Sequence, residues 1–231
     1  AWTLLEPMLA LSVITVLYGA YCALAQQDLK RLVAYSSLSH MGFILLGIAT
    51  MSRAGIDGSI IQMISHGVIT GGLFLWIASI EERFRTRMVS GFGGLSTAVP
   101  VFATVFTILG LAATGFPGMS AFVGEFLILS GVFQGHYVIG GLAVLGVVLG
   151  VVYMCWVYYR LILFKPADPY AGGIGDIGFR ETLCFLPLIV VILVVGVQPG
   201  ILLEFMRASV DQFVNGLQSA KAVMAAVGGA R

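Results

Sequence analysis

A glutamate and two histidines stand inside otherwise apolar stretches of this sequence. Glu125 is surrounded by apolar neighbours in the segment 121–126, and His40 and His66 lie in two earlier apolar runs. An ionisable side chain inside a membrane span costs about 2.5–3.5 kcal/mol on insertion scales, so each is a functional candidate by default. Because imidazole and carboxyl groups bind and pass protons near physiological pH, these three residues predict a hydrated proton relay.

Polar residues accompany both histidines at the four-residue spacing of a helix face. Ser36 and His40 share one such face, and Gln62, His66 and Thr70 form a polar stripe on a second helix. His40 lies about nine residues, or ~14 Å at 1.5 Å per residue, from the charged start of its helix. This depth places His40 near the middle of a membrane.

Each candidate also has a simpler interpretation. A single intramembrane histidine can serve only as a hydrogen-bond partner between helices. Two histidines and a glutamate could in principle hold a metal ion, although none of them has the close spacing of a helix-borne ligand pair. Lys30 is a further candidate for proton translocation, but with Arg31 it is more simply read as a topology determinant at a helix entrance.

The composition indicates that hydrocarbon surrounds most of the chain. Of 231 residues, 59% are hydrophobic and 10% are charged, whereas soluble domains have roughly 45–50% and 25%. This balance excludes a soluble enzyme. The net charge of +1 gives no sign of nucleic-acid binding, which needs clustered Lys and Arg. The three cysteines, odd in number and far apart, predict neither a disulfide framework nor a metal site.

The elements that must position these residues are apolar runs, each of which meets the ~20-residue requirement for spanning a bilayer as a helix. The backbone cannot leave polar groups unpaired in lipid, and the runs lack the alternation of barrel strands. The sequence therefore predicts an all-α membrane protein with about six transmembrane helices. The runs are Leu4–Ala25, Leu32–Met51, Ile60–Ile80, Ala98–Phe133, Val138–Phe164 and Leu183–Leu203.

The fourth run is too long for one straight crossing, because its ~36 residues would make a helix of about 54 Å. We expect a break at the sequence Gly-Phe-Pro-Gly over residues 115–118, where Pro117 lacks an amide and the glycines permit unwound backbone. Broken helices line hydrated cavities in many carriers. The alternative is a proline kink without function.

Charge counting predicts the orientation of the helices. If all six runs span, eight cations fall on one side and four on the other, and the positive-inside rule places the first set in the cytoplasm. The chain then enters from the outside and finishes there, with residues 204–231 as an amphipathic helix in the interface. The apolar face of that helix is predicted to comprise Met206, Val210, Phe213 and Leu217, opposite Arg207, Asp211 and Gln218. The first set is Lys30, Arg31, Arg83, Arg85, Arg87, Arg160, Lys165 and Arg180; the second is Arg53, Arg207, Lys221 and Arg231.

Several segments carry a resemblance to a known family. The run from Asp28 to Gly42, DLKRLVAYSSLSHMG, is closely similar to the signature of the antiporter-like subunits of complex I, a family shared with Mrp antiporters and membrane-bound hydrogenases. QMISHG at residues 62–67, GFPG at 115–118 and FVGEF at 122–126 follow in the family's order. A glutamate at position 125 resembles the M-type subunit (chain 4), since related subunits usually carry lysine there.

The resemblance implies a specific architecture. The family's fourteen helices contain two inverted five-helix repeats, each with one broken helix, and this chain resembles helices nine to fourteen. Residues 1–164 would form the second repeat, 182–203 the final spanning helix and 204–231 an interfacial amphipathic tail, within a single transmembrane domain over 1–231. The family's first repeat is not in this sequence, so this chain alone should not pump.

The resemblance also implies a function, which is proton translocation in the membrane arm of a quinone-reducing complex I, in a bacterial cytoplasmic membrane. His40 and His66 would be central relay residues and Glu125 the terminal site of the outward half-channel. The chain has no signature for a redox cofactor, so NADH, FMN, iron–sulfur clusters and quinone are expected in partner subunits. Expected partners are other antiporter-like subunits, a chain that supplies the first repeat, and lipids.

Three other readings stay open from the sequence. The equivalent subunit of a membrane-bound hydrogenase or formate hydrogenlyase can also carry a glutamate at this position. An Mrp-type sodium/proton antiporter subunit would transport without a redox partner. A purely structural membrane half would only hold its neighbours.

Overall fold

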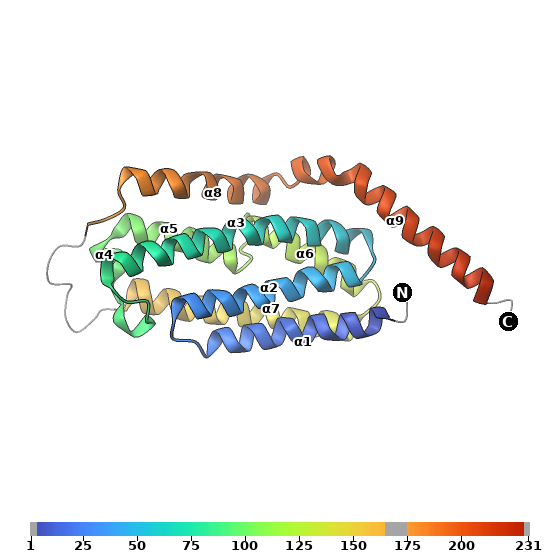
Figure 1. Ribbon diagram of the computed structural model, residues 1–231, viewed down its shortest axis with the longest axis horizontal. Coiled ribbons are helices and arrows are strands. Elements are labelled where there is room, and N and C mark those ends of the chain that lie inside the picture. The colour runs from blue at the N-terminus through green and yellow to red at the C-terminus, as the bar shows by residue number, and fades with distance from the viewer. Residues whose placement is uncertain (1–3, 165–174, 229–231) are drawn as a thin grey trace.

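The computed structural model describes residues 4–164 and 175–228, and within these ranges its regular elements are all helices, with only one isolated β-bridge (Figure 1). Most helices lie side by side along the long axis of the molecule. The helices are α1 (Leu5–Leu24), α2 (Leu29–Ala49), α3 (Arg53–Phe84), α4 (Leu95–Ala98), α5 (Pro100–Ala113), α6 (Ser120–Phe133), α7 (Tyr137–Tyr158), α8 (Phe179–Val197) and α9 (Gly200–Gly228), with short non-α turns at Val89–Gly91 and Tyr159–Leu163.

Six crossings are formed as the sequence predicts. In the described ranges, α1, α2, α3, α7 with its extension and α8 are each long and apolar enough to span a membrane. The pair α5 and α6 makes the remaining crossing from two shorter apolar helices. Side chains fix two of the starts: Asp28 accepts from the amides of Lys30 and Arg31 at the start of α2, and Ser52 accepts from the amide of Gly55 at the start of α3.

The fourth run is broken at the expected place. Helix α5 ends at Ala113, α6 begins at Ser120, and the connecting residues lie midway along the bundle (Figure 1). Gly115 and Gly118 have φ angles of 65° and 92°, a region that side chains rarely adopt. The break therefore depends on glycine at both places.

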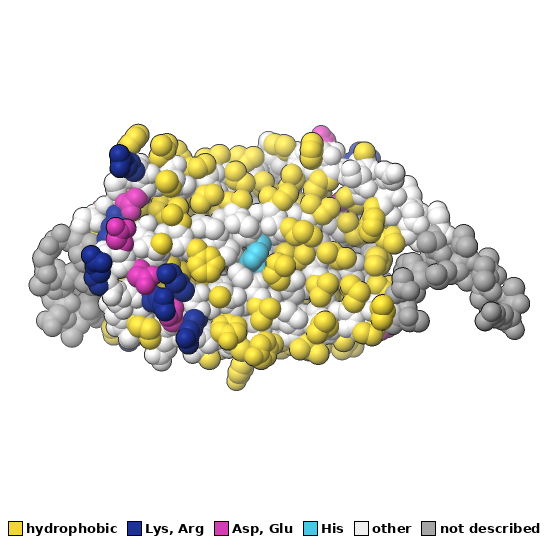
Figure 2. All heavy atoms as spheres, in the orientation of Figure 1, with side chains coloured by type: hydrophobic (Ala, Val, Ile, Leu, Met, Phe, Trp, Pro, Cys, Tyr) yellow, Lys and Arg dark blue, Asp and Glu magenta, His cyan; other side chains and the backbone are white. Residues whose placement is uncertain are grey.

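Charged side chains gather at one end of the molecule (Figure 2), the end at which α1, α3 and α7 finish and α2 begins. Ion pairs tie the start of α2 to the end of α3 there, since Lys30 contacts Glu81 at 2.7 Å and Arg87 contacts Asp28 at 2.7 Å. The predicted segregation of cations is confirmed for the described members of the set. Lys165 lies outside the described residues.

The C-terminal part differs from the sequence prediction in one boundary. The apolar run 183–203 is not one helix, because α8 ends at Val197 and Pro199 separates it from α9. Helix α9 begins beside the bundle and runs obliquely outward past one of its ends (Figure 1). In its first part, Met206, Val210 and Val214 are buried in one cluster with Ile56 and Ile61 of α3.

The apolar face predicted for the tail is only partly correct. Met206 and Val210 are buried as expected, but Phe213 is 51% exposed and Val214 takes its place in the contact. An ion pair between Arg53 and Asp211 also fastens α9 to the start of α3. The predicted position of this segment in a membrane interface stays a prediction, and the side chains of Gln218 and Lys221, together with Arg231, lie outside the described residues.

Candidate functional site

His40 of α2 and Glu125 of α6 meet in the interior of the bundle. The Nδ1 atom of His40 lies 3.3 Å from Oε1 of Glu125, and their side chains are only 13% and 8% exposed. Both residues were predicted from the sequence as proton carriers. The fold brings them together although 85 positions separate them in the chain, because α6 is the half of the broken crossing that packs against α2 and α3.

Gln62 of α3 bridges the two. Its Nε2 atom lies 3.4 Å from Nδ1 of His40 and 3.4 Å from Oε1 of Glu125, and the residue is 1% exposed. Its carbonyl oxygen is held against Gly124, where an added Cβ atom would lie 2.5 Å from that oxygen. The sequence placed Gln62 only on a polar stripe with His66, and its contact with Glu125 depends on how α3 and α6 face one another.

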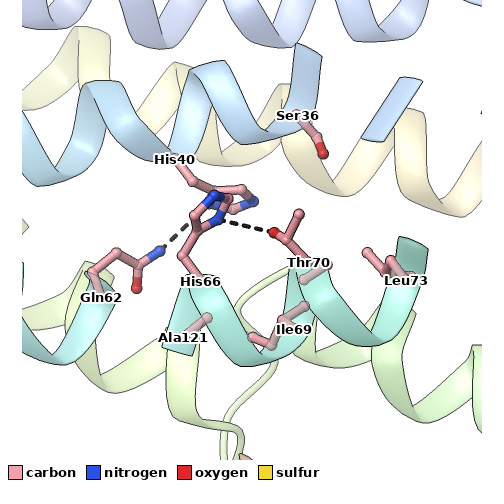
Figure 3. Close-up of a pocket in the computed structure, with 9 residues that line it drawn as sticks. Ser36, His40, Gln62, His66, Ile69, Thr70, Leu73 and Ala121 are labelled. Carbon is pink, nitrogen blue, oxygen red and sulfur yellow. Dashed lines mark hydrogen bonds between the residues drawn. The ribbon is translucent and has the colours of Figure 1, made fainter. Parts of the chain in front are cut away.

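His66 stands beside His40 from the facing helix (Figure 3). The centroids of the two imidazole rings are 5.5 Å apart, and Nδ1 of His66 lies 3.2 Å from the hydroxyl of Thr70. The predicted stripe is confirmed, since Gln62, His66 and Thr70 all line one small cavity with His40 and Ser36. The two imidazoles, the amide and the carboxyl group thus form one continuous polar cluster.

Two small cavities lie next to His40. The first has a volume of about 10 Å³ and is lined by Ser36, His66 and Thr70 among others. The second, also about 10 Å³, is lined by Glu125, Tyr153 and the segment at Thr114 where α5 ends. Each has space for about one water molecule. Since His40 lines both cavities, it connects them.

Tyr153 of α7 is a site residue that the sequence analysis missed. It is 1% exposed and lines the second cavity together with Glu125. A tyrosine in an apolar run is an ordinary core residue, so the only available signal was its phenol, which needs a hydrogen-bond partner when buried.

The break in the fourth crossing is shaped around Glu125. An added Cβ atom at Gly115 would lie 2.6 Å from Oε2 of Glu125, so the carboxyl group rests directly on the glycine. Gly118 and Met119 are in turn covered by α8, where a Cβ atom added at Gly196 would lie 2.2 Å from the carbonyl oxygen of Gly118. The glycines thus provide both the backbone shape and the space for the carboxyl group.

Several polar atoms around the cluster have no protein partner. Within the described residues, the hydroxyl groups of Ser37, Ser65 and Ser120 and the carbonyl oxygen of Gln62 are buried without a hydrogen bond. Buried polar groups are normally satisfied, by protein or by ordered water. We therefore expect water molecules at these atoms, which extend the polar cluster along the bundle.

Lys30 does not belong to this cluster. Its ammonium group forms an ion pair with Glu81 at the charged end of the molecule, with 40% of the side chain exposed. Lys30 lines neither of the two cavities beside His40. In the described ranges no group of three His, Cys, Asp or Glu side chains is placed to hold a metal ion.

A family model and individual relatives place this chain among the same group of membrane proteins. Residues 1–150 match the family described as NADH:quinone oxidoreductase/Mrp antiporter, transmembrane. NADH-ubiquinone oxidoreductase chain 4 of Marchantia polymorpha is 42% identical over 206 residues, which cover 88% of this chain and 41% of that protein. NADH-quinone oxidoreductase subunit M of Rhodobacter capsulatus is 39% identical over 204 residues, which cover 88% of this chain and 40% of that protein.

The fold of a solved structure agrees with this family assignment. A chain in respiratory complex I from Thermus thermophilus with bound NADH superposes with a TM-score of 0.84 at 32% identity, covering 92% of this chain and 45% of that one. The chain spans about two fifths of the length of the curated relatives it matches.

Proposed function

The chain belongs to the NADH:quinone oxidoreductase/Mrp antiporter transmembrane family, and on that premise we propose that it carries protons across the membrane as part of an M-type subunit of a quinone-reducing complex I. Its share of that subunit is the second five-helix repeat and the final spanning helix. The electrons pass through NADH, FMN, iron–sulfur clusters and quinone in partner subunits, and this chain carries out no redox step.

The observation that carries the proposal is the contact between His40 and Glu125. An imidazole nitrogen and a carboxyl oxygen 3.3 Å apart, both nearly inaccessible, can exchange a proton after a small adjustment of either side chain. The contact lies beside a broken helix, where carriers commonly place their transport sites. A histidine that only joined helices would not need a glutamate and a second histidine next to it.

The path follows from the order of the polar groups. Thr70 and Ser36 lie toward the charged end of the bundle, followed by His66, then His40, then Glu125 at the break. The gap between the two imidazoles fits a bridging water in the first cavity. If the charged end faces the cytoplasm, protons enter beside Thr70 and leave from Glu125 toward the opposite side.

Gln62 makes this exchange less costly. Its amide nitrogen has two N–H groups and stands 3.4 Å from both proton-carrying atoms. When the proton resides on His40, the amide donates to the bare carboxylate, and when the proton resides on Glu125, the amide donates to the bare Nδ1. The atom without the proton therefore always accepts a hydrogen bond from Gln62. Neither protonation state leaves a buried polar atom unsatisfied.

The test is Glu125→Gln in the assembled complex, in membranes in which proton translocation and quinone reduction are measured together. Glutamine has nearly the same shape and cannot carry the proton. We expect fewer protons translocated per electron, while electron transfer to quinone continues. The matched control is Glu204→Gln, the same change at an exposed position of α9. An unchanged proton-to-electron ratio in Glu125→Gln at an unchanged rate would reject the relay.

An Mrp-type role is the second candidate, because the matching family description covers both kinds of protein. The two functions differ in what drives transport. An antiporter exchanges sodium for protons in vesicles without any electron donor, whereas the proposed subunit translocates protons only while quinone is being reduced. Measurement of sodium-driven proton flux in the absence of a donor separates them.

A further inference from the structure

A cavity with several polar side chains lies at the charged end of the molecule, away from the proton cluster. It has a volume of about 260 Å³ and is formed where the end of α7 meets the turn between α1 and α2 and the short helix after α3. Its lining contains no carboxylate and one cation. The lining residues are Gln27, Val89, Ser90, Trp156, Tyr159 and Arg160.

Arg160 is presented to this cavity by an irregular turn. Residues Tyr159–Leu163 form a π-helical turn, closed by a hydrogen bond of 2.9 Å from the amide of Phe164 to the carbonyl of Tyr159. The Arg160 guanidinium lies 4.3 Å from the centre of the Phe164 ring and forms no ion pair with any described carboxylate. Stacking on an aromatic ring leaves the in-plane N–H groups of a guanidinium free to bind an anion in bidentate fashion.

Three other side chains of the cavity can donate hydrogen bonds to a ligand, and all three are exposed. Within the described part of the chain, the Ser90 hydroxyl, the Trp156 indole N–H and the Gln27 amide group have no hydrogen-bond partner. An arginine with several neutral donors and no acidic neighbour is the chemistry of an oxyanion site. A phosphate, sulfate or carboxylate group would match these donors.

The surface next to the cavity indicates where that anion comes from. Leu145, Val148 and Val152 are exposed on α7 and follow one another at three- and four-residue spacing, which continues to Trp156 at the cavity. This stripe gives an acyl chain an apolar path that ends at the donors. A tryptophan at the boundary between the two is the usual arrangement at a membrane interface.

We propose that this cavity binds the phosphate of an anionic membrane phospholipid, with Arg160 as the principal contact and the stripe from Leu145 to Trp156 as the seat of an acyl chain. Basic pockets between membrane helices bind lipid headgroups in this way. The bound lipid would join the end of α7 to the turn at Gln27 and to Ser90. The proposal is independent of the proton relay, because the cavity shares no residue with the cluster at His40.

The experiment measures lipid binding by the purified chain in mild detergent, with native mass spectrometry. The probes are phosphatidylglycerol, phosphatidylcholine and inorganic phosphate as a competitor. Arg160→Gln removes the charge, and Arg85→Gln makes the same change at an exposed arginine of the same end that does not line the cavity. Trp156→Phe removes only the indole donor and keeps the packing. Circular dichroism verifies that each variant is folded.

We expect phosphatidylglycerol to bind more tightly than phosphatidylcholine, and Arg160→Gln to weaken that binding by about tenfold or more, as loss of a charged hydrogen-bond partner does. Arg85→Gln should bind as the unchanged protein does, and Trp156→Phe should weaken binding less than Arg160→Gln. Equal phosphatidylglycerol binding by the Arg160→Gln and Arg85→Gln variants would overturn the site. Should Arg160→Gln fail to fold, unchanged binding by Trp156→Phe would overturn it. Displacement of the lipid by millimolar inorganic phosphate would overturn the phospholipid as its ligand.

Discussion

At the scale of single residues, Glu125 is held by contacts from two helices and from the break in the fourth crossing. His40 of α2 approaches one carboxyl oxygen, Gln62 of α3 donates to the same oxygen, and Gly115 supports the other. In this setting His40 can accept the proton of the carboxyl group, and Gln62 can donate a hydrogen bond to the carboxylate that remains. This is the setting that the proposed proton relay requires of Glu125.

Gly115 provides the sharpest prediction at this scale. Gly115→Ala forces a side chain into a backbone conformation with φ of 65° and brings Cβ within 2.6 Å of Oε2 of Glu125. We expect a loss of about 1–3 kcal/mol in the free energy of unfolding and a fall in proton translocation, because the carboxyl group must move. Thermal unfolding in detergent and proton flux in membranes measure the two effects.

Gly67→Ala is the matched control for that change. Gly67 lies inside α3, next to His66, and an added Cβ atom there would meet nothing within 4 Å. In a helix interior alanine is favoured over glycine by roughly 0.5–1 kcal/mol, so stability should stay the same or rise. If Gly115→Ala behaved as Gly67→Ala does in both measurements, the role assigned to the break would be wrong.

At the scale of elements, the start of α2 is fastened by Asp28. Its carboxylate accepts from the amides of Lys30 and Arg31 and pairs with Arg87 beyond the end of α3. Burial acts to raise the pKa of Asp28, but the amide of Arg31 and the guanidinium of Arg87 together outweigh burial and lower that pKa below its ordinary value. Asp28 therefore fixes where the helix that carries His40 begins.

The lowered pKa predicts a pH dependence with a definite sign. A depressed folded-state pKa contributes stability that is fully present above the unfolded value of about 3.9 and is lost as pH falls through the folded value. Asp28→Ala should therefore cost about 0.5–2 kcal/mol at neutral pH and show a flatter decline of stability below pH ~4. Unfolding curves at a series of pH values measure both.

Asp28→Asn separates the two roles of this side chain. Asparagine is as good a helix cap as aspartate but cannot pair with Arg87, so it should retain most of the neutral-pH stability and lose the acid dependence. If the acid dependence persisted in Asp28→Asn, Asp28 would not be its source.

At the scale of the whole molecule, much of the architecture could be predicted from the sequence. Six apolar runs, the break at Gly115 and the charged end follow from hydropathy, backbone chemistry and charge, which are local properties. The predicted end of the last spanning helix was wrong, because the apolar run continues through Pro199 whereas α8 ends at Val197. Local patterns give the elements but not the exact ends of adjoining helices.

The site was predictable to a lesser extent. His40, His66 and Glu125 were found because an ionisable group in an apolar run is visible in the sequence. The bridge made by Gln62 and the burial of Tyr153 were missed, because they depend on which faces of non-consecutive helices meet. The role of Lys30 in proton translocation stays a prediction, and its position at the charged end favours an ion pair that joins helices.

The central claim is that His40 and Glu125 belong to one proton path, and a double-variant measurement tests it most directly. Proton translocation per electron is measured in assembled complexes that carry His40→Gln, Glu125→Gln or both. If both residues act in one path, each single variant abolishes proton transfer along it. The double variant should then translocate as many protons per electron as either single variant. If each single variant were only partly impaired and the losses multiplied in the double variant, the two residues would act independently, which would contradict the claim.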